Sequence, residues 1–364
     1  NNFWCPTWTD YHNTVASAAL HSMRTGEVQW IDELTIPGAL RTLHTQIFQC
    51  SPSDNYFYCG QSPAGYGAYR ANFNSSHAYF FNLFTYYWLT GDGTVVEILQ
   101  RGASRMRNYL CSRRPAAACG PNDPTTDPSA RLAGRVSSQW FAAFRFVGLA
   151  SEDASFLDDW RGNMGRAATR HYAALQNNGQ SYGFWTDSVI GGAGSHRTGQ
   201  LWMVSLYDMR NMERLMRDTA DAPIGSPAVR PSEVLISWAR TLEDYGARVA
   251  GNGTAAGVWP NQLDFSFSGA RIGGNLSSVS GNVDHDNDGQ TCDTGDECLW
   301  SSGKATLCTV VVNAGLWTSN LSMTALGREL TERALGNALT VEVLNKRQGL
   351  YMSRLHEAVK ALSE

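Results

Sequence analysis

The feature of this sequence that most constrains the fold is a recurring pair of helical segments joined by a short turn. Residues 75–90 are apolar on nearly every face, which is typical of a helix that is buried on both sides. Gly91-Asp92-Gly93 interrupts this segment, and residues 94–110 then carry apolar side chains at the i, i+3, i+4 spacing of a helix buried on one side. This order indicates an inner helix followed by an outer helix.

The same pattern recurs along most of the chain. Further pairs are expected at 9–24 with a helix to about 49, at 136–150 with 154–175, at 198–217 with 232–249, and at 303–318 with 321–345 and 350–362. Turns at Gly26, Gly91 and Glu152 recur roughly every sixty residues, as in proteins built from helix-pair repeats. β-strand signals are sparse. We therefore predict an all-α fold of five to six helical hairpins in a single domain over residues 1–364.

Composition narrows the class of protein and its partners. The chain has 364 residues, of which 43% are hydrophobic and 17% are charged, as expected for a globular protein with a sizeable core. A net charge of −4 without a basic stripe argues against nucleic acid or an anionic membrane as the main partner. No apolar run reaches the roughly 18 residues that span a bilayer. The start at Asn1, without Met, indicates a processed or trimmed product.

Arginine strongly outnumbers lysine, since Lys304, Lys346 and Lys360 are the only lysines among 29 basic residues. One interpretation is functional, because the planar guanidinium group suits carboxylate and phosphate ligands. The other interpretation is that the bias reflects genome composition.

The cysteines point to an oxidising compartment. The eight cysteines form three close pairs and two single positions: Cys50 and Cys59, Cys111 and Cys119, Cys292 and Cys298, then Cys5 and Cys308. An even number and short spacings favour local disulfides, with Cys5–Cys308 as a long-range bridge. The alternative of a zinc site is not supported, because no C-x2-C motif is present. We therefore expect a secreted, periplasmic or cell-surface protein.

One acidic loop has the spacing of a calcium site. Residues 284–298 contain D-x-D-x-D-G, with candidate ligands at Asp284, Asp286, Asp288, Gln290, Asp293, Asp296 and Glu297. Alternating oxygens, a glycine at the tight turn and a backbone carbonyl next to it are what a Ca²⁺ loop requires. Gly295 stands where an EF-hand has Glu, so later carboxylates would complete the shell. We predict a structural Ca²⁺ that helps to order a long irregular insertion at 251–302; the alternative is a solvated acidic loop.

Residues 77–92 (HAYFFNLFTYYWLTGD) resemble the inner-helix and turn signature of (α/α) toroid polysaccharide lyases and glycoside hydrolases. The similarity is closest to the toroid domains of exo-acting rhamnogalacturonan lyase-like proteins. It implies an (α/α) toroid and a function in carbohydrate chemistry. Those lyase-like families usually also carry a β-sandwich domain, and this sequence shows no such segment.

In a toroid, the loops that precede the inner helices surround one end of a central funnel, which suggests where the chemistry lies. For a lyase, Arg135, Arg197 or Lys304 would neutralise a uronate carboxylate, His77 or His196 would remove the neighbouring proton, and Tyr11 or Tyr79 would protonate the leaving oxygen. The other candidates are catalytic Asp10 and His12 and sugar-binding Trp8, Trp140, Trp185 and Trp259. The alternative is that the polar residues of these loops are helix caps.

Two other function classes remain open. A hydrolase would need paired carboxylates, for which Asp10, Asp187 and Asp264 are candidates. A non-catalytic glycan-binding or surface-assembly protein would use the same scaffold without a reaction. We take β-elimination of an acidic polysaccharide as the leading hypothesis. The oligomeric state is not indicated.

His171 is a contrasting histidine. It continues the apolar stripe of a predicted outer helix, so we predict a packed side chain without a catalytic role.

Overall fold

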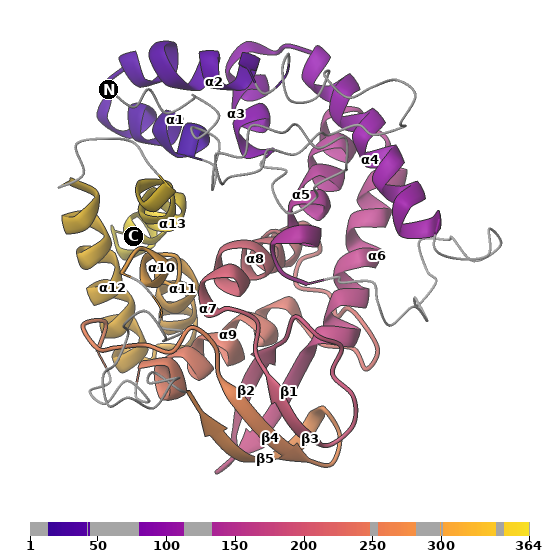
Figure 1. The fold of residues 1–364 in the computed structure, drawn as a ribbon, viewed down its shortest axis with the longest axis vertical. Coiled ribbons are helices and arrows are strands. Elements are labelled where there is room, and N and C mark those ends of the chain that lie inside the picture. Colours follow the sequence, from indigo (N-terminus) through magenta and orange to yellow (C-terminus); the bar gives the residue numbers. More distant parts are fainter. Residues whose placement is uncertain are drawn as a thin grey trace, which may run out of the picture. The chain divides into compact units, whose positions relative to one another are not determined.

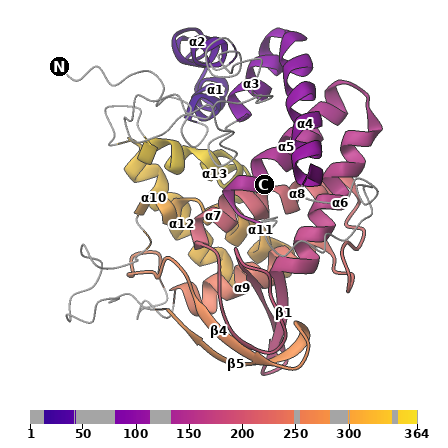
Figure 2. The same cartoon turned by 45° about the vertical axis from the view of Figure 1, so that its right-hand side comes forward.

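The computed structural model describes residues 14–41, 43, 80–112, 133–247, 254–281, 299, 301–339 and 346–363. The chain divides into two compact units. The first unit comprises residues 1–130, 135–163 and 341–353, and the second comprises 131–134, 164–340 and 354–364. Helices make up most of the described chain, and the second unit also contains a β-sheet (Figures 1 and 2).

The described part of the first unit is helical. Its elements are α1 (Thr14–Thr25), the π-helix η3 (Ile31–Thr35), α2 (Ile36–Arg41), α3 (Phe81–Thr90), α4 (Thr94–Ser112), α5 (Arg135–Ala150) and the start of α6 (Ala154–His171). α3 contacts α1, α2 and α4, and α4 contacts α5. Aromatic side chains fill the core between them; the rings of Phe84 and Phe146, for example, stack with centroids 4.3 Å apart.

The predicted turns between paired helices are confirmed. Gly91 ends α3 in the left-handed conformation with φ 70°, and its N–H donates to Tyr87 O at 2.7 Å. Gly26 follows α1 with φ 81°, and Glu152 lies between α5 and α6 with φ 57°. A positive φ of this kind ends a helix sharply and favours glycine.

The second unit has a helical layer centred on α9. Its elements are α7 (Leu201–Met203), η8 (Val204–Asp208), α8 (Met209–Asp218), α9 (Pro231–Thr241), η9 (Leu242–Ala247), α10 (Ser301–Ala305), α11 (Cys308–Thr318), α12 (Leu321–Leu339) and the end of α13 (Lys346–Ser363). α9 contacts α8 and α11 as well as two strands of the sheet, and α11 packs along α12 (Figure 1). α9 therefore joins the helices to the sheet.

The sheet has five strands in the order β2-β1-β5-β4-β3. They are β1 (Tyr172–Asn177), β2 (Gln180–Trp185), β3 (Gly194–Arg197), β4 (Asp264–Ser268) and β5 (Ile272–Ser280). β1 and β5 run parallel, and the other neighbouring strands are antiparallel. Asn178 and Gly179 connect β1 to β2 with φ of 50° and 76°, the positive values of a tight two-residue hairpin loop. Phe184 and Phe265 stack across the sheet with centroids 4.2 Å apart.

The prediction of an all-α toroid of helical hairpins is wrong. The structure is mixed, because five strands form a sheet where only helices and loops were expected. Leu175, assigned to the stripe of an outer helix, lies in β1 instead. The segment 251–302, expected to lack regular structure, contributes β4 and β5. Pairing between strands far apart in the chain stabilises them, and helical periodicity alone does not detect this.

The close packing of α11 on α12 makes a specific prediction at Gly327. A Cβ there would lie 2.7 Å from Val312 Cγ2 and 2.9 Å from the Val312 backbone nitrogen, so Gly327→Ala should destabilise the protein by about 1–3 kcal/mol. Gly336, on the same helix, has open space where a Cβ would lie, with no atom within 4 Å, so Gly336→Ala should stabilise by up to about 1 kcal/mol. Urea unfolding of both variants measures the difference; equal midpoints would contradict the packing argument.

Candidate functional site

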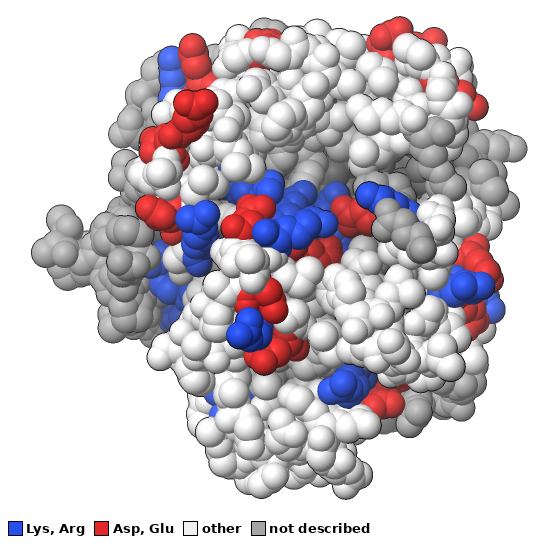
Figure 3. All heavy atoms as spheres, turned by 180° about the vertical axis from the view of Figure 1, so that it is seen from behind, with Lys and Arg blue, Asp and Glu red and all other residues white. Residues whose placement is uncertain are grey.

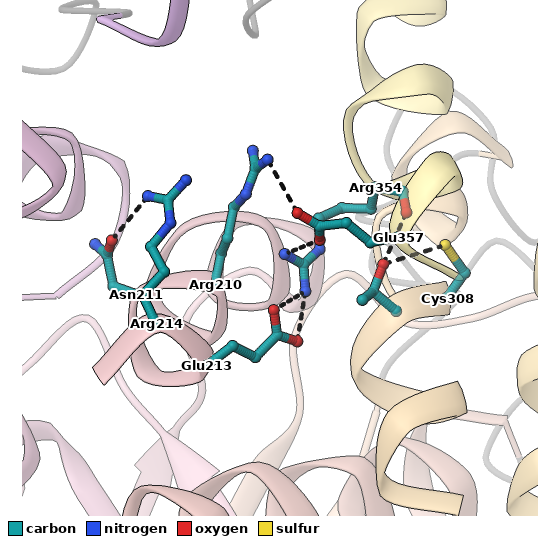
Figure 4. Close-up of polar contacts among 8 residues, drawn as sticks. Arg210, Asn211, Glu213, Arg214, Cys308, Arg354 and Glu357 are labelled. Atoms are coloured by element: carbon teal, nitrogen blue, oxygen red, sulfur yellow. Dashed lines mark hydrogen bonds and ion pairs between the residues drawn. The ribbon is translucent and has the colours of Figure 1, made fainter. Parts of the chain in front are cut away.

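The described residues bring several charged side chains together where α8, α11 and α13 meet (Figure 4). α8 contributes most of them, since residues three and four apart share one face of a helix. The polar stripe of α8 is Arg210, Glu213, Arg214 and Arg217. The middle of α13 contributes Arg354 and Glu357, three residues apart. We call Arg210, Glu213, Arg214, Arg354 and Glu357 the arginine–glutamate network.

The inner part of the network is a buried ion pair. Arg354 Nη2 donates to Glu213 Oε1 at 2.6 Å and to Oε2 at 2.7 Å, and the two side chains are 0% and 5% exposed. Thr309 Oγ1, on α11, donates to the Arg354 backbone carbonyl at 2.8 Å. Buried charges are tolerated only when they are paired in this way, so the pair anchors the second half of α13 to α8.

The outer part of the network lies closer to solvent. Glu357 Oε2 is 2.7 Å from Arg354 Nη1, and Arg210 Nη2 donates to Glu357 Oε1 at 3.2 Å. The Arg210 side chain is 11% exposed and that of Glu357 is 29% exposed. Arg214 Nη1 reaches Asn211 Oδ1 at 3.5 Å. Figure 4 shows these contacts running from Glu213 through Arg354 and Glu357 to Arg210.

Burial and the neighbouring carboxylates shift the pKa values of Arg210 and Arg354 in opposite directions. Burial lowers the pKa of Arg210, and the carboxylate of Glu357 partly offsets that shift. Burial would also lower the pKa of Arg354, but the nearby carboxylates of Glu213 and Glu357 raise it above its usual value. The five side chains of the network comprise three guanidinium groups and two carboxylates. The ion pairs join two of these guanidinium groups, those of Arg210 and Arg354, to the two carboxylates, and Arg214 adds a third guanidinium group beside Asn211. Guanidinium groups in a partly desolvated setting suit carboxylate ligands.

One face of the protein carries charges of both signs. On the face drawn in Figure 3, basic and acidic side chains lie close to one another instead of forming separate fields. Long-range attraction of a polyanion needs a field of one sign. Any recognition of an acidic group here is therefore local and depends on the geometry of individual guanidinium groups.

His196 and Arg197, predicted to act together, lie on opposite faces of β3, because neighbouring residues of a strand alternate. The His196 ring stacks on Phe267 with centroids 5.3 Å apart, and its Nε2 lies 3.1 Å from Gly192 O. Arg197 donates from Nε and Nη2 to Asp264 at 2.6 and 3.0 Å. The structure therefore does not bring these two residues to one reaction centre, and it occupies Asp264 with an ion pair.

Most of the other predicted binding residues are buried or bonded to the backbone. Trp140, Trp185 and Trp259, predicted to bind sugar, are 0% exposed, so their rings fill the core. Lys304 Nζ donates to the carbonyls of residues 255 and 257 at 3.0 Å each, and burial lowers its pKa. Arg135 is the first residue of α5.

Asp187 and Asp208 both lie near Gly134. Gly134 N donates to both oxygens of Asp208, at 2.9 and 3.0 Å, and a Cβ on Gly134 would be 3.1 Å from Asp187 Oδ1. Since two bonds of about 1.5 Å join that nitrogen to a Cβ, the two carboxylates are at most about 9 Å apart. Asp208 is 1% exposed, whereas Asp187 is partly exposed. Asp208 lies in the π-helix η8 and was not among the residues predicted from the sequence.

Many predicted positions lie outside the described residues. They are Trp8, Asp10, Tyr11, His12, His77 and Tyr79, the calcium loop at 284–297, and Cys5, Cys50, Cys59, Cys119, Cys292 and Cys298. Cys111 lies in α4, and Cys308 is buried at the start of α11. The calcium site and the disulfides stay predictions.

The arginine–glutamate network was missed by the sequence analysis. The stripe on α8 and the Arg354/Glu357 pair were visible as polar positions on predicted helices, but no motif connects them, and Arg354 is 141 residues from Glu213. Within the described residues, no helix is both long and apolar enough to cross a membrane. Comparison of the chain with protein-family models, with curated proteins and with solved structures gave no match.

Proposed function

We propose that this protein binds an acidic polysaccharide and that Arg210 and Arg214 hold a uronate carboxylate. The observation that carries the proposal is the cluster of three guanidinium groups in the arginine–glutamate network, at which Arg214 and Glu357 are partly exposed. Arg210 and Arg214 are four residues apart and therefore lie on one face of α8. Guanidinium groups form paired, charge-assisted hydrogen bonds with carboxylates.

The reaction that fits this ligand best is β-elimination. A guanidinium group that neutralises a uronate carboxylate makes the neighbouring C–H more acidic, which is the first requirement of that reaction. The candidate base His77 and the candidate acid Tyr11 come from the sequence analysis and lie outside the described residues. Secretion into an oxidising compartment and a structural Ca²⁺ at 284–297 belong to the same proposal.

Calorimetric titration with a short oligogalacturonate tests the binding step. The wild-type chain should bind the free acid and lose most of its affinity for the methyl ester, because esterification removes the charge. Arg214→Met should weaken binding about tenfold, the effect of one hydrogen bond to a charged group. Arg328→Met, at an exposed position of α12, is the matched control and should bind as the wild type does. Equal affinity for acid and ester would contradict the proposal.

Product analysis separates the reaction classes. A lyase forms a carbon–carbon double bond conjugated with the carboxylate, which raises ultraviolet absorbance as the polymer is cleaved. New reducing ends without that absorbance would instead indicate hydrolysis. The observation that favours hydrolysis as a second candidate is that Asp187 and Asp208 both lie near Gly134, which keeps their nearest oxygens within about 9 Å, the upper limit for paired-carboxylate chemistry. Binding without either product would leave a glycan-binding protein.

A further inference from the structure

Glu357 holds, with its own carboxylate, the Arg210 guanidinium group that the proposed function assigns to an acidic ligand. Among the four residues that the ion pairs of the network connect, it is the most exposed, at 29%, against 11% for Arg210 and 5% for Glu213. One of its oxygens accepts from Arg210, and the other faces Arg354. It therefore places a carboxylate of the protein itself on Arg210, the more exposed of the two guanidinium groups in these ion pairs.

We propose that Glu357 is a built-in competitor, and that an acidic ligand binds by displacing its carboxylate from Arg210. This inference rests on the proposed function and adds a form of regulation to the same site. The exchange replaces one carboxylate with another, so the charge of the network is conserved. A neutral sugar has no group to compensate Arg210 and would leave Glu357 in place, which makes the competition a filter for acidic ligands.

When Glu357 turns away from the network, the buried charge of Arg354 still has a carboxylate partner. Both oxygens of Glu213 accept from Arg354 Nη2, so Arg354 keeps a carboxylate partner when Glu357 turns away. The two glutamates differ in their freedom to move. Glu213 is almost fully enclosed, whereas the partly exposed Glu357 can reach water by rotating its own side chain.

Binding of a short oligogalacturonate to the full chain and its variants tests this competition. Glu357→Gln should bind about tenfold tighter than the wild type, because the ligand no longer displaces a charged competitor. Arg210→Met should bind more weakly, and the Arg210→Met/Glu357→Gln double variant should not recover the gain. Glu332→Gln, at an exposed position of α12, removes one negative charge elsewhere and should leave the affinity unchanged.

The outcomes separate the two proposals. Affinity in Glu357→Gln that equals or falls below that of the wild type would overturn the competition while leaving acidic-ligand binding intact. Absence of binding in the wild type and in all variants would overturn both. Should Glu357→Gln fail to fold, Glu357→Asp keeps the charge on a shorter side chain that cannot reach both arginines. That variant should also bind more tightly, and wild-type affinity in it would count against the competition.

Discussion

Glu213→Gln should lower the free energy of unfolding by about 3–5 kcal/mol, the cost of removing one partner from a buried ion pair. Arg354 is 0% exposed, and both of its hydrogen bonds from Nη2 go to the carboxylate of Glu213. The substitution keeps the shape of the side chain and removes its charge, so a guanidinium group is left under-compensated in the core. Urea unfolding at pH 7 measures the loss.

An exposed ion pair in the same unit is the matched control. Arg197 and Asp264 are 49% and 45% exposed, so Asp264→Asn should cost less than about 1 kcal/mol. Replacing both buried partners with apolar residues, in the Glu213→Leu/Arg354→Met variant, should recover most of the stability lost in Glu213→Gln. If Glu213→Gln and Asp264→Asn lower the free energy of unfolding by a similar small amount, burial does not determine how much the Arg354–Glu213 pair stabilises the protein.

Acidification should destabilise the protein through His171. This side chain at the end of α6 is 1% exposed, as predicted from its place on an apolar stripe, and its Nδ1 lies 3.2 Å from Ser188 O. Burial lowers its pKa from 6.5 to about 4, so the folded state favours the neutral ring. The resulting stability is fully present above pH 6.5 and is lost as the pH falls towards 4, by about 3 kcal/mol in total.

Urea unfolding of the wild type and His171→Gln at pH 7, 5.5 and 4 checks this linkage. The glutamine does not titrate and can still donate to Ser188 O, so the variant should lose about 3 kcal/mol less than the wild type between pH 7 and pH 4. The difference should already be measurable at pH 5.5. Parallel acid dependence in the two proteins would mean that other groups account for the loss.

Helix positions could be predicted because their signals are local. The apolar segment at 75–90 and the glycine after it correspond to α3 and to the left-handed Gly91. The stripe after residue 94 corresponds to α4. Each signal depends on residues within a few turns of one another, so no knowledge of distant contacts was needed.

The strands were missed although two local signals were present. Asn178-Gly179 is a strong hairpin dipeptide, and Phe265 and Phe267 alternate with serines as in a half-buried strand. Helical periodicity continued to Leu175 and obscured the first signal, and the glycine-rich surroundings suggested a loop for the second. What stabilises these strands is non-local, since β1 pairs in parallel with β5, about a hundred residues later.

The sequence by itself determined the order and the ends of most helices, the burial of His171 on an apolar stripe, and the small excess of acidic over basic residues. Only the tertiary structure decided that Arg354 meets Glu213 and that His196 and Arg197 face apart. The physical reason is that a helix is specified by neighbours along the chain, whereas a charged site needs side chains from distant segments. Their pairing depends on how the helices and the sheet pack, because packing alone sets which charges lose water and must find a partner.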